Sequence, residues 1–126
     1  MKTILVDAYN TFVTEEWINL KMQKMLDKFE NKKIILTNAD EEKQKVLWLV
    51  NLPYEMFSLN FNPLKTDSEF YKIFLEKFNL KAEEVIYFEH NNDAVKSARS
   101  VGINTFHYNK DKKDIIELGE FIKNNI

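Results

Sequence analysis

The stretch Thr3–Thr11, which reads TILVDAYNT, decides how this sequence folds. Its first residues, Thr3–Val6, form a short run rich in strand-forming side chains, and Asp7 follows directly. A run this short, bounded by polar residues, is typical of a buried strand. A carboxylate at the end of such a strand can attack phosphorus or carbon and form a covalent intermediate. Asp7 is therefore the first candidate functional residue, although an Asp here can equally cap the following turn.

Four further short apolar runs follow along the chain. They are Lys33–Leu36, Glu55–Leu59, Val85–Phe88 and Asn104–Tyr108. Longer segments with apolar residues three and four apart separate these runs, and this spacing predicts helices. Strands that alternate with helices are typical of βαβ units with right-handed crossovers. The sequence therefore predicts an α/β fold with a mostly parallel sheet of five strands.

Helices are predicted in five segments by the same spacing. They are Thr14–Phe29, Glu41–Val50, Phe70–Phe78, Ala94–Val101 and Ile115–Ile122. Asp40 stands where an N-cap is expected for the second helix. Thr66 and Glu69 form a candidate capping box for the third helix. Gly102 stands where a helix-ending residue is expected after the fourth.

The composition is that of a globular domain. The 126 residues are 44% hydrophobic and 30% charged, and 18 basic against 20 acidic residues give a net charge of −2. This balance argues against a broad nucleic-acid footprint, and the lack of cysteine excludes disulfides and thiolate metal sites. No signal peptide is recognised, and no apolar run reaches the ~20 residues of a membrane span. We expect residues 1–126 to form one cytoplasmic domain with no nucleic-acid or membrane partner.

Polar residues at the strand ends deserve most weight, because ligands of open parallel sheets bind beyond the carboxyl ends of the strands. Thr37 and Asn38 follow the second run, where a hydroxyl and backbone N–H groups can hold an anionic oxygen. Lys65 precedes the third helix, so its ammonium lies beside the positive end of a helix dipole. Taken singly, each has an ordinary interpretation as a loop start or a solvated surface lysine.

The fourth run is followed by the polar cluster Glu89–Asp93, which reads EHNND. Oxygen ligands in this cluster could hold Mg²⁺. Asn92 or Asp93 is also expected to cap the helix that follows.

Together these four segments resemble, in order, the four motifs of the haloacid dehalogenase-like (HAD) hydrolase superfamily. Residues 7–11, DAYNT, are similar to its first motif, D-x-D-x-T, and closest to the D-x-Y-G-T form of its dehalogenases. Thr37-Asn38 resembles the second motif, and residues 65–71, KTDSEFY, resemble K-P-D-P-E-x-Y. The fourth motif, D-D-S-x-x-N-V-x-x-A-x-x-x-G-I, is matched in its helix at Val95, Ala98, Gly102 and Ile103. Glu89-His90 stand at its acidic pair.

This resemblance covers nearly the whole chain and implies a Rossmann-like three-layer sandwich. The five strands are then expected in the order 5-4-1-2-3. No cap domain is expected, because residues 12–13 lead straight to the first predicted helix and residues 60–64 are the only ones between the third strand and Lys65. The domain 1–126 would be a HAD-like core.

The resemblance also implies roles for individual residues. Asp7 would be the nucleophile, and Thr37 and Lys65 would bind phosphoryl or carboxylate oxygens with Thr11 and Asn38 beside them. Mg²⁺ would be held by Asp7 and the backbone carbonyl of Tyr9. Its further ligands would come from Glu89, His90 or Asp93.

Three positions depart from the family pattern. Tyr9 stands where the phosphatases carry an aspartate as general acid, and a phenol with a pKa near ~10 is a poor acid at neutral pH. His90 stands at the usual carboxylate position of the fourth motif and Ala94 at the later Asn/Asp position, whereas Mg²⁺ prefers oxygen ligands. Asn10 replaces a glycine, which is a mild change because Asn tolerates left-handed backbone.

Three functions are consistent with these residues. The leading hypothesis is a phosphohydrolase that forms an aspartyl-phosphate at Asp7 and acts on a phosphorylated substrate with a good leaving group, of any size up to a macromolecule. The second is a catalytically silent HAD-fold binding or scaffold protein. The third is dehalogenation, which Tyr9 favours, although Arg99 is the only arginine and is predicted on a helix away from the strand ends. An oligomer is compatible with all three.

A response-regulator receiver is the rival fold. It requires an acidic pair after the first strand and an aspartate after the third, but Ala8 follows Asp7 and residues 59–62 contain no carboxylate. The aromatic residues Trp17, Trp48, Phe57 and Phe61 are expected in the core. Phe57 and Phe61 lie near the edge of the predicted site and could instead face a partner.

Overall fold

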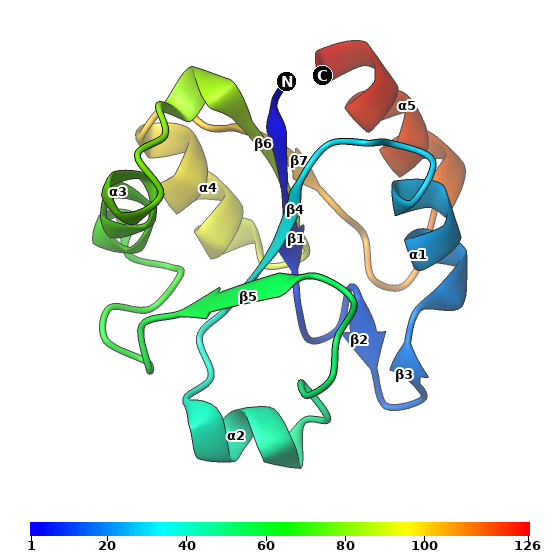
Figure 1. The fold of residues 1–126 in the computed structure, drawn as a ribbon, viewed down its shortest axis with the longest axis horizontal. Coiled ribbons are helices and arrows are strands. Elements are labelled where there is room, and N and C mark those ends of the chain that lie inside the picture. Colours follow the sequence, from blue (N-terminus) through cyan, green and yellow to red (C-terminus); the bar gives the residue numbers. More distant parts are fainter.

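The computed structural model describes residues 1–126 and contains one five-stranded sheet with helices around it (Figure 1). Its elements, in chain order, are β1 (Thr3–Asp7), β2 (Val13–Thr14), β3 (Trp17–Ile18), α1 (Leu20–Leu26), β4 (Lys33–Thr37), α2 (Glu41–Val46), β5 (Glu55–Ser58), α3 (Ser68–Lys77), the 3-10 helix η1 (Ala82–Glu84), β6 (Val85–Glu89), α4 (Asn92–Ser100), β7 (Asn104–His107) and α5 (Ile115–Asn125). The five main strands are the five predicted runs, shifted by no more than one residue at their ends.

The sheet has the order β5-β4-β1-β6-β7, and all four pairings are parallel. This is the predicted order 5-4-1-2-3 read from the opposite edge, so the predicted topology is confirmed. β1 lies in the middle, with β4 on one side and β6 on the other. The central strand therefore carries Asp7 to the middle of the carboxyl edge, between the ends of its two neighbours.

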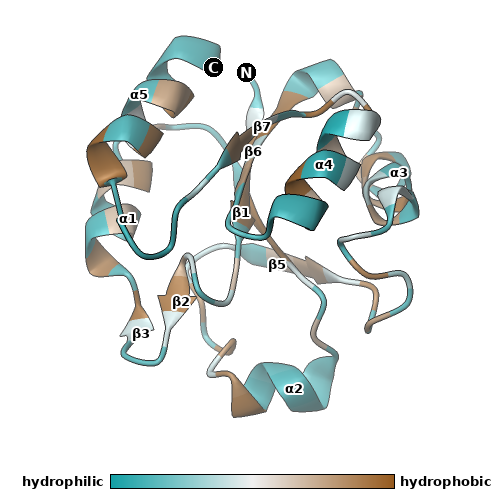
Figure 2. Ribbon diagram, turned by 180° about the vertical axis from the view of Figure 1, so that it is seen from behind, coloured by the Kyte–Doolittle hydropathy of each residue, from teal (hydrophilic) through white to brown (hydrophobic).

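Helices cover both faces of the sheet and make it the middle of three layers. Ile4 and Val6 of β1 belong to a core cluster shared with α1 and α5, whereas Leu5 belongs to a second cluster shared with α3 and α4. This alternation is the period of two that a strand imposes on its side chains. In Figure 2, α4 and α5 each carry hydrophobic residues along one side and hydrophilic residues along the other. The predicted α/β three-layer sandwich is confirmed.

The segment between β1 and α1 corrects the predicted helix over Thr14–Phe29. A two-stranded hairpin of β2 and β3 occupies its beginning, with Val13 paired to Ile18. Trp17 has a φ of 81°, which no right-handed helix accommodates. The helix α1 begins only after Asn19, whose side chain accepts a hydrogen bond from the N–H of Met22 at 3.1 Å. No cap domain is inserted here, as predicted.

Helix starts agree with the sequence in one case and differ in another. Asp40 caps α2 as predicted, since its side chain accepts from the N–H of Lys43 at 2.8 Å. The cap of α3 is Asp67 and not Thr66, because α3 begins at Ser68 and Asp67 accepts from the N–H of Glu69 at 2.9 Å.

At the ends of α4, the predicted N-cap differs from the structure and the predicted final glycine agrees with it. Asn91 caps the helix, where Asn92 or Asp93 was the expected cap, and its side chain accepts from the N–H groups of Asp93 and Ala94. Gly102 follows the helix with a φ of 91°, a conformation that glycine adopts without strain. Its predicted place is confirmed.

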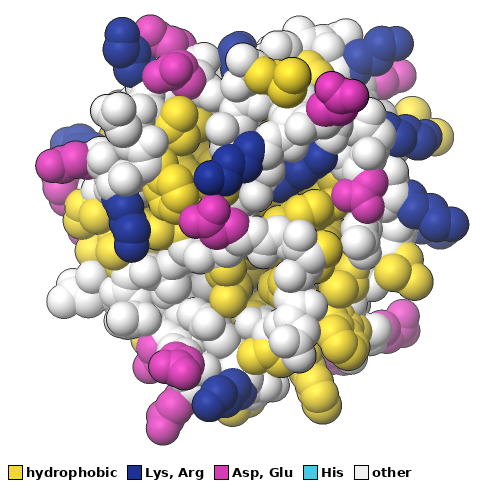
Figure 3. All heavy atoms as spheres, viewed as in Figure 1, with side chains coloured by type: hydrophobic (Ala, Val, Ile, Leu, Met, Phe, Trp, Pro, Cys, Tyr) yellow, Lys and Arg dark blue, Asp and Glu magenta, His cyan; other side chains and the backbone are white.

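Helix α2 stands apart from the three layers, beyond the carboxyl edge of the sheet (Figure 1). It ends at Val46 and not at Val50, and Trp48 after it has a φ of 60°. Trp48 is 61% exposed, and Trp17 and Phe61 are exposed as well, so their predicted core placement is wrong; only Phe57 is buried. Hydrophobic side chains show at the surface in the lower right of Figure 3, where the hairpin and the loop after α2 lie.

The two ends of the chain meet at the amino edge of the sheet (Figure 1). The ammonium of Lys2, next to the start of β1, donates to the backbone oxygen of Asn125 in α5 at 2.8 Å. None of the helices has the length and apolar character needed to cross a bilayer.

Candidate functional site

A cavity of about 260 Å³ lies at the carboxyl edge of the sheet. The ends of β1, β4 and β6 form its floor, and α2 and the loop before α3 contribute to its walls. Most of the residues singled out from the sequence line it, namely Asp7, Tyr9, Thr37, Asn38, Lys65, Glu89 and His90. Thr11 is buried beneath it, and Asp93 is exposed outside it on the first turn of α4.

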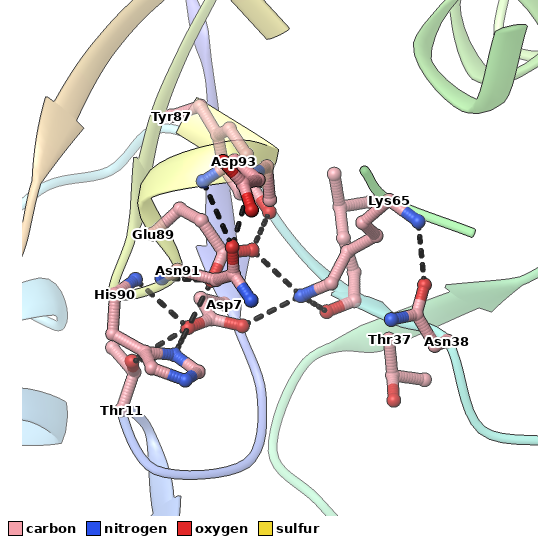
Figure 4. Close-up of polar contacts among 12 residues, drawn as sticks. Asp7, Thr11, Thr37, Asn38, Lys65, Tyr87, Glu89, His90, Asn91 and Asp93 are labelled. Carbon is pink, nitrogen blue, oxygen red and sulfur yellow. Dashed lines mark hydrogen bonds and ion pairs between the residues drawn. The ribbon is translucent and has the colours of Figure 1, made fainter. Parts of the chain in front are cut away.

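Asp7 lies at the centre of the site and is 1% exposed (Figure 4). Its Oδ1 is 2.6 Å from Nζ of Lys65. Its Oδ2 accepts from the hydroxyl of Thr11 at 2.6 Å and from the backbone N–H of His90 at 3.1 Å. The imidazole Nδ1 of His90 contacts the same oxygen. Both oxygens of the candidate nucleophile are therefore held in fixed directions.

Lys65 reaches into the site from the loop before α3, and its side chain is 8% exposed. Besides Asp7, its Nζ contacts Oε1 of Glu89 at 2.8 Å and donates to the backbone oxygen of Leu36 at 3.2 Å. These three partners match the three protons of an ammonium group. Its backbone N–H donates to Oδ1 of Asn38 at 2.6 Å, which fixes the loop against the end of β4.

Glu89, at the end of β6, is fully buried. With Asp7, Lys65 and His90 it forms a charged group at the floor of the cavity. Its Oε1 also accepts from the hydroxyl of Tyr87, and its Oε2 accepts from the N–H of Asn91 at 3.0 Å. Oε2 also lies 3.2 Å from Nδ1 of His90. Tyr87 was missed in the sequence, although the two-residue spacing to Glu89 places both side chains on the same face of a strand.

The charges of this group control its protonation. Burial alone would raise the pKa of Asp7, but the ammonium of Lys65 and the hydrogen bond from His90 outweigh it and hold that pKa far below its usual range. Burial would lower the pKa of Lys65, but Asp7 and Glu89 raise it. Burial would likewise lower the pKa of His90, yet its contacts with the same two carboxylates raise it to about 9. At neutral pH, Asp7 is ionised while Lys65 and His90 are protonated.

The wall of the cavity opposite Asp7 is polar, and its side chains form fewer contacts with one another than the charged group does. The hydroxyl of Thr37 accepts from the N–H of Ala39 at 3.2 Å, and Figure 4 shows Thr37 and Asn38 across from Asp7. Lys43 on α2 also lines the cavity and is exposed, a residue that was not singled out from the sequence. Tyr9 lines the cavity and is half-buried. Asn10 beside it has a φ of 70°, the conformation expected of an Asn in place of glycine.

A candidate metal site is contained in the charged group. Asp7, Glu89 and His90 each present one ligand atom, and these atoms lie within 4.8 Å of one another. Exposed Asp93 is not among them. The donor set does not fit Mg²⁺, because one donor is an imidazole nitrogen and both carboxylates are already paired with Lys65.

The only arginine lies away from the cavity. Arg99 is on α4, and its guanidinium donates to the backbone oxygen of Thr105 in β7 at 2.9 Å. The site therefore offers no arginine to a halide ion.

No protein-family model matches this sequence, and no curated protein matches it either. Solved structures do match its fold. A HAD family enzyme from Bacteroides thetaiotaomicron, solved as an aspartate-to-alanine mutant with magnesium and inorganic phosphate, is 12% identical with a TM-score of 0.68, over 85% of this chain and 93% of that one. An uncharacterised protein from Corynebacterium glutamicum is also 12% identical, with a TM-score of 0.66 over 98% and 96% of the two chains.

A third similar structure is the core domain of a candidate phosphoglycolate phosphatase from Streptococcus pneumoniae. It is 15% identical with a TM-score of 0.57, over 92% of this chain and 95% of that one. At such low identities these structures establish the fold, which is the HAD-like core without a cap. The first of the three is described as a HAD family enzyme, and the third is described as part of a phosphatase.

Proposed function

We propose that this protein is a HAD-type phosphohydrolase in which Asp7 forms an aspartyl-phosphate. One observation carries the proposal: an ionised, buried carboxylate lies on the floor of a cavity whose other lining groups suit an anion. These groups are the ammonium groups of Lys65 and Lys43 and the polar end of β4 at Thr37 and Asn38. A fold shared with a structure that contains phosphate agrees with this interpretation.

In the proposed reaction, Oδ1 of Asp7 forms a bond to phosphorus while the bond from phosphorus to the leaving oxygen breaks. The leaving group departs with that electron pair. Water then attacks phosphorus, the bond to Asp7 breaks, and inorganic phosphate is released as water loses a proton to solvent. Lys65 would neutralise the developing charge, and Thr37 and Asn38 would orient the phosphoryl oxygens.

The substrate class follows from the neighbouring residues. Tyr9 is a poor general acid at neutral pH, so the leaving group must depart without a proton. An acyl phosphate or a phosphoanhydride meets this requirement. Because no cap closes the cavity, the phosphoryl group can belong to a large molecule, and we propose a phosphorylated partner of that kind.

The test is phosphate release from acetyl phosphate and from p-nitrophenyl phosphate. We expect faster release from the acyl phosphate. We expect Asp7→Asn to lower the rate about a thousandfold or more, because the nucleophile is lost. Asp93→Asn is the matched control, since Asp93 is exposed outside the cavity and its substitution should leave the rate unchanged. Circular dichroism of both variants separates lost chemistry from lost folding.

The second candidate is a catalytically silent HAD-fold domain that binds or presents a partner. It is favoured by the completeness of the charged group: the hydroxyl of Tyr108 is the only buried side-chain polar atom without a partner, and it does not line the cavity. A group this well satisfied can serve as a structural core without any ligand. If the folded protein releases phosphate from neither acetyl phosphate nor p-nitrophenyl phosphate, the silent binding domain is favoured over the phosphohydrolase.

A further inference from the structure

The imidazole Nδ1 of His90 lies against both carboxylates of the candidate metal site, Asp7 and Glu89. Oδ1 of Asp7 is paired with the ammonium of Lys65, so a cation would have to bind Asp7 through Oδ2. On Oδ2 converge the imidazole Nδ1 of His90, its backbone N–H and the hydroxyl of Thr11. A cation that bridged Asp7 to the end of β6 would have to displace this ring from the oxygen. The side chain of His90 is 21% exposed, so the ring is packed in place and not free in solvent.

The charges of the site also argue against a divalent cation. Two carboxylates, Asp7 and Glu89, face the ammonium of Lys65 and the imidazole Nδ1 of His90. The ammonium lies between the carboxylates, 2.6 Å from one and 2.8 Å from the other. A pair of buried carboxylates attracts Mg²⁺ when its charge is uncompensated, but here the compensation is built into the chain.

Two lysines line the cavity, Lys43 on α2 and Lys65 beside Asp7 and Glu89. The ring nitrogen Nε2 of His90 has no partner in the protein, while Nδ1 is held by the carboxylates. Because Nδ1 is occupied, Nε2 is the ring nitrogen left to contact a ligand in the cavity.

We propose that His90 takes the place of the divalent metal in this site, so that Lys65, His90 and Lys43 bind the phosphoryl group without Mg²⁺. The ligand class, a phosphoryl anion, rests on the proposed function; the claim that His90 fills the metal position does not. The Mg²⁺ predicted from the sequence is then dispensable, and the side chain that departs from the family pattern is the substitute for it.

The direct test titrates the protein with Mg²⁺ by calorimetry and with Mn²⁺ by electron paramagnetic resonance. The wild-type protein should show no saturable binding in the millimolar range. His90→Asp should gain one site, because it adds an oxygen donor and removes the imidazole from the oxygen of Asp7. His107→Asp is the matched control, since His107 is the other histidine, lies at the end of β7 outside the cavity, and should bring no such gain.

One-site Mg²⁺ binding by the wild-type protein that Asp7→Asn abolishes would overturn the proposal. This outcome needs no variant at position 90, so a His90→Asp protein that fails to fold does not protect the proposal. Equal Mg²⁺ binding by wild-type and His90→Asp proteins would overturn it as well.

The second test measures binding of inorganic phosphate and of orthovanadate, once with EDTA and once with Mg²⁺. Wild-type affinity should agree within about twofold between the two conditions, whereas His90→Asp should lose about tenfold or more in EDTA and regain it with Mg²⁺. Wild-type binding that requires Mg²⁺ contradicts the proposal. If neither anion binds in either condition, the proposed function fails, and the metal titration still decides the role of His90.

Discussion

Lys65 and Lys43 line the same cavity, but Lys65 is buried and paired whereas Lys43 is exposed and unpaired. Lys65 is buried, and every proton of its ammonium has an acceptor in the charged group. Lys43 is exposed on α2, beyond the edge of the sheet, and its ammonium forms no ion pair. The difference shows that one wall of the cavity belongs to the core, while the other belongs to the surface. Charge on the first wall is paired within the protein, and charge on the second has no partner in the protein.

The largest expected effect comes from Lys65→Met. The substitution keeps an unbranched chain of similar length but leaves the carboxylates of Asp7 and Glu89 buried without their shared cation. Breaking a buried ion pair on one side costs about 3–5 kcal/mol, so the free energy of unfolding should fall by that amount. Urea denaturation followed by circular dichroism measures it. A loss below about 1 kcal/mol, the range of exposed pairs, would show that this wall is not part of the core.

The next effect is a pH dependence caused by His90. Its folded-state pKa of about 9 lies above its ordinary value of 6.5, so its protonation stabilises the fold fully below pH 6.5. This stability is lost as the pH rises through about 9. The free energy of unfolding should decrease by on the order of 2 kcal/mol across that window. Denaturation at a series of pH values should show the decrease in the wild-type protein and a flatter profile in His90→Gln.

The smallest effect is expected from Lys43→Met, the same substitution on the other wall. Because Lys43 is exposed and unpaired, the free energy of unfolding should stay within about 0.5 kcal/mol of the wild-type value. Phosphate affinity should nevertheless fall by a few-fold, about 1 kcal/mol or less, through the loss of one positive charge at the cavity. If Lys43→Met destabilised the protein as much as Lys65→Met, the contrast between the two walls would disappear.

Much of the fold was predictable because it depends on local patterns. Short apolar runs gave the strands, and alternation with helices led to the parallel sheet, whose order came from the family resemblance. The residues Asp7, Thr37 and Lys65 could be brought together in advance because parallel strands end at one edge. The hairpin of β2 and β3 was not predictable from spacing, since Ile18 continues the helical pattern of α1 while its backbone pairs with Val13.

The arrangement within the site was less predictable. Nothing in the local sequence shows that His90 contacts Asp7, because the two are 83 residues apart and their meeting depends on the packing of β1 against β6. The exposure of Trp17 and Trp48 was also missed, because hydrophobicity predicts burial only on average. Both residues also have a left-handed backbone conformation, which no helical pattern predicts.

The contact between Lys2 and Asn125 has a practical consequence for handling the protein. Both ends of the chain lie at the amino edge of the sheet, and the cavity lies at the carboxyl edge (Figure 1). A tag, a fluorophore or a surface linker attached at either end would therefore leave the cavity facing solution. A short peptide could also join the two ends, and new termini opened in an exposed loop would give a circularly permuted protein with the same sheet.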